Sequence, residues 1–346
     1  MKRLTLSMLV VCAPFIVASA IPKHSATFWE ANKPEVQRAQ RHGAKAKIVY
    51  HVVDDDGKPL ANQQVGYRWQ NDYPRKTWGG HAMTDTNGDV VLQDKVGSEL
   101  TVGVCNKGYY GFGDRIVFYF REGVSPLVKD GKWQPYGEHR TLVLKRIKNP
   151  VEMSFHNWGI DGCRAPATNV WIGLDLESGQ WCKPYGAGKN EDVLVRFSGV
   201  VKNRFTRDTL TEISFTNLPY AGFYTLHKDS FSSLKTCYEA STNDSMYAER
   251  EVYFKSKTAK GMPKDKKEFI HLKSDEYMVF RTRCKVDESG KLISAHYGKI
   301  SGALYGGLMK LLFRSDGSGI YFNPTPNDTN LEDMKTYKES ELLEGR

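Results

Sequence analysis

Paired carboxylates are the residues of this sequence that could carry out acid–base chemistry. Asp175 and Glu177 are two positions apart in the segment 173–179, so both side chains would lie on one face of a strand. Glycoside hydrolysis needs two carboxylates ~5–9 Å apart across a cleft. Acidic residues spaced in this way are also common at a solvated strand edge, and we favour that interpretation. We therefore assign no catalytic residue.

Two aspartate-rich segments offer the oxygen donors that calcium prefers. Residues 54–57 read Asp-Asp-Asp-Gly, and residues 85–89 read Asp-Thr-Asn-Gly-Asp. Neither has a bidentate glutamate at the offset of a calcium loop, and Asp, Asn and Gly form tight turns in their own right. We predict two turns and no metal site. The sequence contains no H-E-x-x-H, G-x-S-x-G, P-loop or dinucleotide fingerprint, so we also expect no cofactor.

Aromatic residues gather between Trp158 and Tyr185. Exposed Trp and Tyr rings can stack on sugars while nearby polar groups bind the hydroxyls. Our candidate ligand-binding residues are therefore Trp158, Asp175, Trp181, Tyr185 and Lys189. Trp171 belongs to a Val-Trp-Ile run typical of a buried strand, and we expect it in the core. The lysine-rich segment 255–267 could add attraction for acidic glycans, although such runs are usually solvated.

Six cysteines are present, and Cys12 lies in the apolar run at the N-terminus. Removing it leaves an odd number, so at least one thiol stays free. We expect Cys105 to be free and buried at the end of a strand-like run. The disulfide candidates are Cys163, Cys182, Cys237 and Cys284, with Cys163–Cys182 and Cys237–Cys284 as the preferred pairs. The absence of C-x-x-C argues against zinc ribbons and thioredoxin-like redox chemistry.

The N-terminus has the pattern of a signal peptide. Met1-Lys2-Arg3 is basic, residues 4–17 are almost entirely apolar, and Ala18-Ser19-Ala20 suits cleavage. We expect a secreted or periplasmic protein with no transmembrane segment after cleavage, because no later segment approaches ~20 apolar residues. The formal charge of +9 falls to +7 once Lys2 and Arg3 are removed. An exported basic chain meets acidic glycans, anionic lipid or cell-wall polymers more often than nucleic acid, although a net charge of this size usually serves solubility alone.

The elements that would position these residues are mostly strands. Segments 46–60 and 83–92 predict strands with turns at Asp56-Gly57 and Asn87-Gly88. Short helices are expected at 27–40 and 231–239. Further strands are expected at 65–69, 98–104, 115–120, 141–144, 192–197, 211–215 and 277–283. This pattern predicts an all-β chain of two β-sandwich-like domains in tandem, with few short helices.

The predicted organisation has five parts. They are a signal peptide (1–20), a lead-in segment (21–44), a first β-sandwich (45–147), a second β domain (148–332) and a charged tail (333–346) that we expect to fray.

Two parts of the chain resemble known families. Asp54–Leu60 (D-x-x-G-x-P-L), Thr84–Leu92 (T-D-x-x-G-x-x-x-L) and Gly108-Tyr109 resemble the carboxypeptidase regulatory-like, transthyretin-type β-sandwich of secreted bacterial proteins. The resemblance implies a sandwich over 45–147 without catalytic residues. Segments 148–153, 173–189, 321–328 and 330–332 resemble the C-terminal part of uncharacterised exported proteins of verrucomicrobial and planctomycete-type bacteria, with departures at Glu152, Cys182 and Ala187. That resemblance implies no activity.

Together these features predict an exported, non-enzymatic β-protein that binds a cell-surface or extracellular glycan or another anionic envelope polymer. Two alternatives stay open. One is a secreted hydrolase with its site in the second domain, and the other is a structural component of the envelope.

Overall fold

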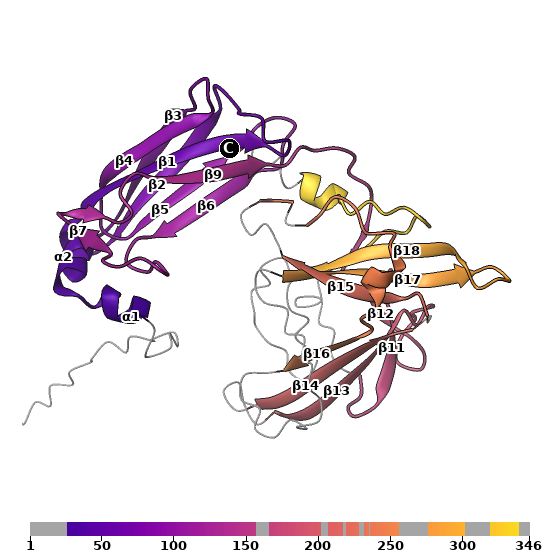
Figure 1. The fold of residues 1–346 in the computed structure, drawn as a ribbon. Coiled ribbons are helices and arrows are strands. Elements are labelled where there is room, and N and C mark those ends of the chain that lie inside the picture. The colour runs from indigo at the N-terminus through magenta and orange to yellow at the C-terminus, as the bar shows by residue number, and fades with distance from the viewer. Residues whose placement is uncertain are drawn as a thin grey trace, which may run out of the picture.

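The chain folds into two β-sandwiches in tandem, which confirms the predicted fold class (Figure 1). The computed structural model describes residues 26–156, 166–201, 207–216, 219–227, 232–234, 236–255, 276–301 and 319–338. The predicted signal peptide lies outside these residues. Within them, no helix has the length and apolar character needed to cross a membrane.

The first sandwich is built from strands β1 to β9. One sheet has the order β4-β1-β8-β7, with β9 also paired to β1, and the other has the order β3-β2-β5-β6. β1 runs antiparallel to β4 and parallel to β9. The strands are β1 (Ala44–Asp54), β2 (Gln64–Asp72), β3 (Arg75–Met83), β4 (Asp89–Val96), β5 (Glu99–Val104), β6 (Phe112–Val117), β7 (Val128–Lys129), β8 (Lys132–Trp133) and β9 (Glu138–Leu144).

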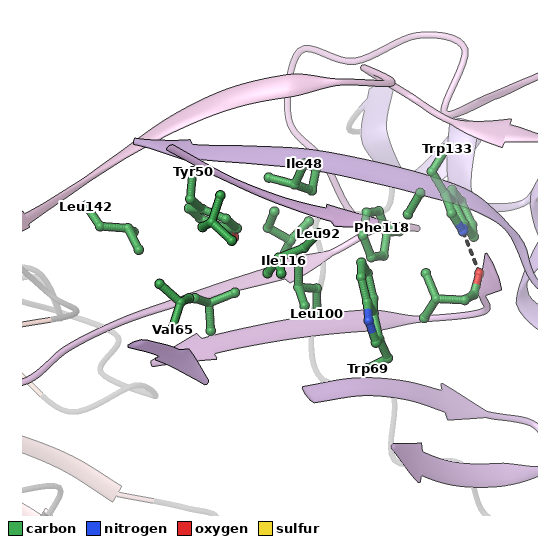
Figure 2. Close-up of a cluster of buried hydrophobic side chains, with 14 of the residues drawn as sticks. Ile48, Tyr50, Val65, Trp69, Leu92, Leu100, Ile116, Phe118, Trp133 and Leu142 are labelled. Carbon is green, nitrogen blue, oxygen red and sulfur yellow. Dashed lines mark hydrogen bonds between the residues drawn. The ribbon is translucent and has the colours of Figure 1, made fainter. Parts of the chain in front are cut away.

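Alternate residues of these strands fill the core between the two sheets (Figure 2). Three rings stack at one end of it, with centroids 6.3 Å apart between Trp69 and Phe118 and 5.7 Å apart between Phe118 and Trp133. The indole of Trp133 donates a 2.7 Å hydrogen bond to the carbonyl of Val96. Each fully buried large apolar side chain contributes about 1.5–3 kcal/mol, so this cluster stabilises the sandwich strongly.

Both predicted turns form. Asp54 accepts hydrogen bonds from the N–H groups of Asp56 and Lys58 through one carboxylate oxygen. Asp85 does the same for Asn87 and Asp89. Gly57 and Gly88 have φ angles of 78° and 79°, which glycine adopts at no steric cost. These aspartates therefore cap turns, as the sequence predicted.

The second sandwich is built from strands β10 to β19, all paired antiparallel. Its sheets have the orders β10-β19-β18-β17-β15 and β12-β11-β13-β14-β16. Alternate residues such as Val195 and Phe197 face Met278 and Phe280 across the core. The strands are β10 (Ser154–His156), β11 (Trp171–Asp175), β12 (Gln180–Trp181), β13 (Val193–Val201), β14 (Arg207–Phe215), β15 (Gly222–His227), β16 (Glu251–Lys255), β17 (Glu276–Val286), β18 (Leu292–Ser301) and β19 (Gly319–Phe322).

Three predictions about helices and the tail need correction. The single helix expected at 27–40 is two, α1 (Ala26–Ala31) and α2 (Pro34–His42), because Pro34 lacks the N–H of a helix interior and sits in a first turn. Residues 232–234 and 236–239 form no helix, and Ser232 instead bridges to Phe112. The start of the tail is anchored, since buried Asp333 pairs with Lys299 at 2.6 Å, while residues 339–346 lie outside the described residues.

Buried polar contacts join the two sandwiches. The Glu332 carboxylate accepts hydrogen bonds from the Tyr110 hydroxyl (2.9 Å) and from the N–H groups of Lys148 (2.7 Å) and Asn149 (2.8 Å). The Tyr238 hydroxyl donates to an Asp55 oxygen at 3.0 Å. Because Glu332 follows the last strand of the second sandwich, the end of the described chain holds the linker against the first sandwich.

Candidate functional site

The predicted ligand-binding residues lie at the end of β11 and in the segment that follows it. Asp175 ends β11, Trp181 lies in β12, and Tyr185 and Lys189 lie between β12 and β13. Trp158 lies outside the described residues. The structure therefore describes four of the five candidates, and their surroundings differ.

Asp175 is buried and folds the segment around itself. One carboxylate oxygen accepts hydrogen bonds from the N–H groups of Glu177 (3.1 Å) and Ser178 (3.3 Å). The other accepts from the N–H groups of Lys189 (3.0 Å) and Asn190 (3.4 Å). Because both oxygens are engaged, Asp175 acts as a structural residue, and only the backbone of Lys189 takes part in this contact.

Arg283 brings three carboxylates together from the opposite sheet. Its guanidinium contacts Asp175 at 2.9 Å and Asp192 at 2.9 Å, and it also binds Glu177. Arg283 has a φ of 50° at an irregularity in the pairing of β17 with β18, and its guanidinium carbon lies 4.5 Å from the centre of the Phe322 ring. The backbone irregularity in β17 therefore lies at the residue whose side chain forms ion pairs with the opposite sheet.

The two buried carboxylates differ in pKa. Burial raises the pKa of Asp175, but the N–H groups of Lys189 and Ser178, together with Arg283, outweigh burial and hold that pKa below its usual value. Burial keeps the pKa of Asp192 above its usual value, although Arg283 opposes the shift. Asp175 and Glu177 share one guanidinium, so they do not face a substrate as a free acid–base pair. The Asp175–Glu177 pair therefore gives no support to a hydrolase.

The aromatic candidates divide into one structural ring and one exposed ring. Trp181 is half-buried, packs against the second core, and meets Phe197 edge to face with centroids 5.8 Å apart. Tyr185 is 41% exposed. Trp181 therefore serves the core, while Tyr185 is available at the surface.

Trp171 is 41% exposed, and the expectation that it lies in the core was wrong. Ile172 and Leu174 point inward, so alternation along β11 turns Trp171 outward. The Val-Trp-Ile run was misleading because Val170 precedes the strand and is itself exposed. To predict from the sequence that Trp171 points outward, one would have to know that the strand begins at Trp171 and not at Val170.

Three residues form a row across the outer face of this sheet, which we name the Trp171 ladder. Trp171 pairs with Arg196 on β13, and Arg196 pairs with Glu212 on β14. The guanidinium carbon lies 4.6 Å from the centre of the indole, and the guanidinium binds the Glu212 carboxylate through two contacts, at 2.6 and 2.8 Å. The Glu212 side chain is buried. The exposed ring therefore rests on a side chain that is itself held in place.

The three aspartates at the first turn offer oxygens within 4.8 Å of one another. Arg146 already contacts Asp54 there, and it contacts Asp56 at 2.8 Å. A guanidinium thus supplies the positive charge, and an Asp54 oxygen caps the turn. The turn interpretation accounts for this cluster.

The preferred pairing of Cys237 with Cys284 is wrong, since both are free thiols. The Cys237 N–H donates to the Tyr277 hydroxyl at 2.7 Å, whereas Cys284 lies near the far end of the same strand as Tyr277. A rise of ~3.3 Å per residue separates those positions by roughly 20 Å. A disulfide needs Cα atoms within about 7 Å.

Two of the remaining cysteines, Cys182 and Cys105, also differ from expectation. Cys182 is a free thiol whose sulfur donates to the carbonyl of Asn190 at 3.4 Å, and Cys163 lies outside the described residues. Cys105 was expected to be buried, but it is exposed because β5 ends at Val104, one residue earlier.

Comparison with known proteins assigns no family. No family model matches the chain, and no curated protein matches it. Among solved structures, 3-chlorocatechol 1,2-dioxygenase from Rhodococcus opacus 1CP is similar at 16% identity and a TM-score of 0.24, over 31% of this chain and 62% of that one. A streptococcal ancillary pilin is similar at 12% identity and a TM-score of 0.22, over 65% of this chain and 61% of that one. This chain thus spans less than two thirds of either protein, and these TM-scores are too low to assign a function.

Proposed function

We propose that this chain is an exported, non-enzymatic β-protein that binds a cell-surface or extracellular glycan through the Trp171 ladder. The observation that carries the proposal is the exposed indole of Trp171 on a sheet face. An indole exposed on a rigid strand offers a flat apolar surface on which a sugar ring can stack.

The geometry of the ladder suits a sugar. Arg196 and Glu212 hold each other through two contacts, so the indole that rests on Arg196 loses little freedom when a ligand binds. The apolar face of a pyranose can stack on the ring, while the polar edge of Arg196 is placed to meet hydroxyl groups. Tyr185 offers a second exposed ring in the same sandwich. Export, inferred from the N-terminal pattern, would bring these rings to envelope polysaccharides.

The test compares two tryptophan variants of the full chain in pull-down with envelope polysaccharide and on a glycan array. Trp171→Ala is expected to weaken binding by about tenfold, since aromatic contacts contribute roughly 0.5–1.5 kcal/mol beyond the buried area. Trp29→Ala is the matched control, because Trp29 is more exposed, at 63%, and lies on α1 in the lead-in segment. Undiminished binding by a folded Trp171→Ala variant would overturn the proposal.

A third variant separates the role of the ladder from that of charge. Arg196→Lys keeps the positive charge but loses the planar fork that grips Glu212. We expect weaker glycan binding in this variant at unchanged net charge. Equal glycan binding by Arg196→Lys and the parent chain would mean that only the charge matters. That result would contradict a role for the contact between Arg196 and the Trp171 indole.

A further inference from the structure

The outer face of the sheet β3-β2-β5-β6 in the first sandwich carries a groove of about 580 Å³ that is open to solvent. Three glycines lie side by side on neighbouring strands across this face, with His81 at the β3 end of the row. Gly66 pairs with His81 and Gly103, and Gly103 pairs with Gly113. The His81 ring lies above Gly66, about an ordinary contact distance from where a Cβ would stand. The floor of the groove is therefore the His81 ring over Gly66 and bare backbone at Gly103.

Packing explains one glycine of the groove but not the central one. A Cβ on Gly79 would stand 2.0 Å from the carbonyl oxygen of Tyr67, so the fold requires glycine there. A Cβ on Gly103 would meet nothing within 4 Å, and the φ angle of Gly103 is not in the left-handed region. Glycine inside a strand weakens it, and it often marks a place where a ligand approaches the backbone closely. Gly103 keeps the floor open without serving the packing.

The rim of the groove carries one guanidinium without a partner. Arg68 lies two residues from Gly66 on the same face, next to Thr101 on β5, and it makes no hydrogen bond or ion pair with any residue that the structure describes. Arg115, on the next strand of the same row, is instead neutralised by Glu99 at 2.5 Å. The groove therefore combines one free cation with hydroxyl groups and a floor that no side chain covers at Gly103.

We propose that this groove binds a carboxylated sugar of an acidic polysaccharide. One face of the pyranose ring lies on Gly103 beside the His81 ring, the carboxylate pairs with Arg68, and hydroxyls meet Thr77 and Thr101. A guanidinium binds a carboxylate through two parallel hydrogen bonds. A single free cation matches one acidic group for each ring, whereas a neutral sugar would leave Arg68 unpaired. The site is separate from the Trp171 ladder, which lies on the other sandwich.

The test titrates the full chain with an oligogalacturonate, and with the neutral galactose oligomer of the same length. Gly103→Val places a Cβ where no other atom lies within 4 Å and puts a β-branched residue in a strand, so we expect the fold to be kept while binding is lost. Arg68→Gln is expected to weaken oligogalacturonate binding by about tenfold or more. Arg38→Gln, at an exposed position on α2, is the matched control for charge and should bind like the parent chain.

Three results would each overturn the groove proposal. They are parent-like binding by Gly103→Val and Arg68→Gln, equal binding of the neutral oligomer, and displacement of the uronate by inorganic phosphate at the same concentration. Trp171→Ala in the same titration should leave uronate binding intact. Failure of the groove and failure of the Trp171 ladder can therefore be told apart.

Discussion

Replacing Arg283 with glutamine tests whether its guanidinium stabilises the second sandwich. The variant Arg283→Gln removes the charge that Asp175, Asp192 and Glu177 share. The side chain of Asp192 is 0% exposed and that of Asp175 is 4% exposed, whereas that of Glu177 is 40% exposed. The loss of Arg283 would therefore leave two buried carboxylates without a counter-charge.

The expected cost follows from burial. Removing one partner of a buried ion pair costs about 3–5 kcal/mol, because the other charge stays buried and unpaired. Contacts to an exposed carboxylate such as Glu177 add little, about 0–1 kcal/mol. We therefore expect the free energy of unfolding of the second sandwich to fall by about 3–5 kcal/mol at neutral pH. Adding Asp192→Asn should recover part of this loss by removing one unpaired charge.

The pH dependence gives an independent readout. Arg283 lowers the pKa of Asp192 against the effect of burial, so its removal should raise that pKa further. A carboxyl whose pKa is raised in the folded state stabilises the fold below its unfolded pKa, and that stabilisation is lost as the pH rises through the folded value. The deficit of Arg283→Gln should therefore shrink as the pH falls from neutral toward ~4.

Hydrogen exchange of the β11 and β13 amides under increasing urea would measure the effect on the second sandwich alone. Lys338→Gln is the matched control, because the Lys338–Glu152 pair is well exposed on both sides and should contribute little. A loss below about 1 kcal/mol in Arg283→Gln, or a deficit that grows on acidification, would refute the reasoning.

Three further predictions concern other parts of the chain. Glu332→Gln weakens the contact that holds the linker, so we expect faster proteolysis after Lys148 in limited digestion; an unchanged rate would contradict this role. Burial raises the pKa of the Cys284 thiol to about 11, so its alkylation rate should keep rising up to that pH, where an ordinary thiol levels off near ~8.5. Gly88→Ala should destabilise the first sandwich more than Gly57→Ala in thermal unfolding, since only at Gly88 would a Cβ approach a carbonyl oxygen, at 2.6 Å.

Features set by neighbouring residues could be predicted from the sequence. In each of the turns at residues 54–58 and 85–89, an aspartate accepts hydrogen bonds from the N–H groups two and four positions later. The aspartate and both N–H donors lie within five consecutive residues, so the local sequence was enough to predict the turn. Strand β3 was missed, because Gly79 and Gly80 give it a weak strand pattern. The two sandwiches were predictable because turn signals and alternating strands recur along the chain.

The candidate site was harder to predict, because its contacts join distant segments. Asp175 looked like a surface carboxylate, but its guanidinium partner comes 108 positions later, from the opposite sheet. Trp171 looked like a core residue, since a short apolar run does not say which of its members faces inward. The row of Gly66, Gly103 and Gly113 is visible only once strand register is known.

The contacts of Glu332 with Tyr110 and the linker bear on how a long polymer would be held. Because Glu332 of the second sandwich binds both Tyr110 of the first sandwich and the linker at Lys148 and Asn149, these contacts oppose free motion of the two sandwiches about the linker. A polysaccharide that reaches both the groove and the Trp171 ladder would make its second contact as an intramolecular event, at high effective concentration and without ordering a loose linker. Weak recognition of single sugars would then become tight retention of a chain, through avidity.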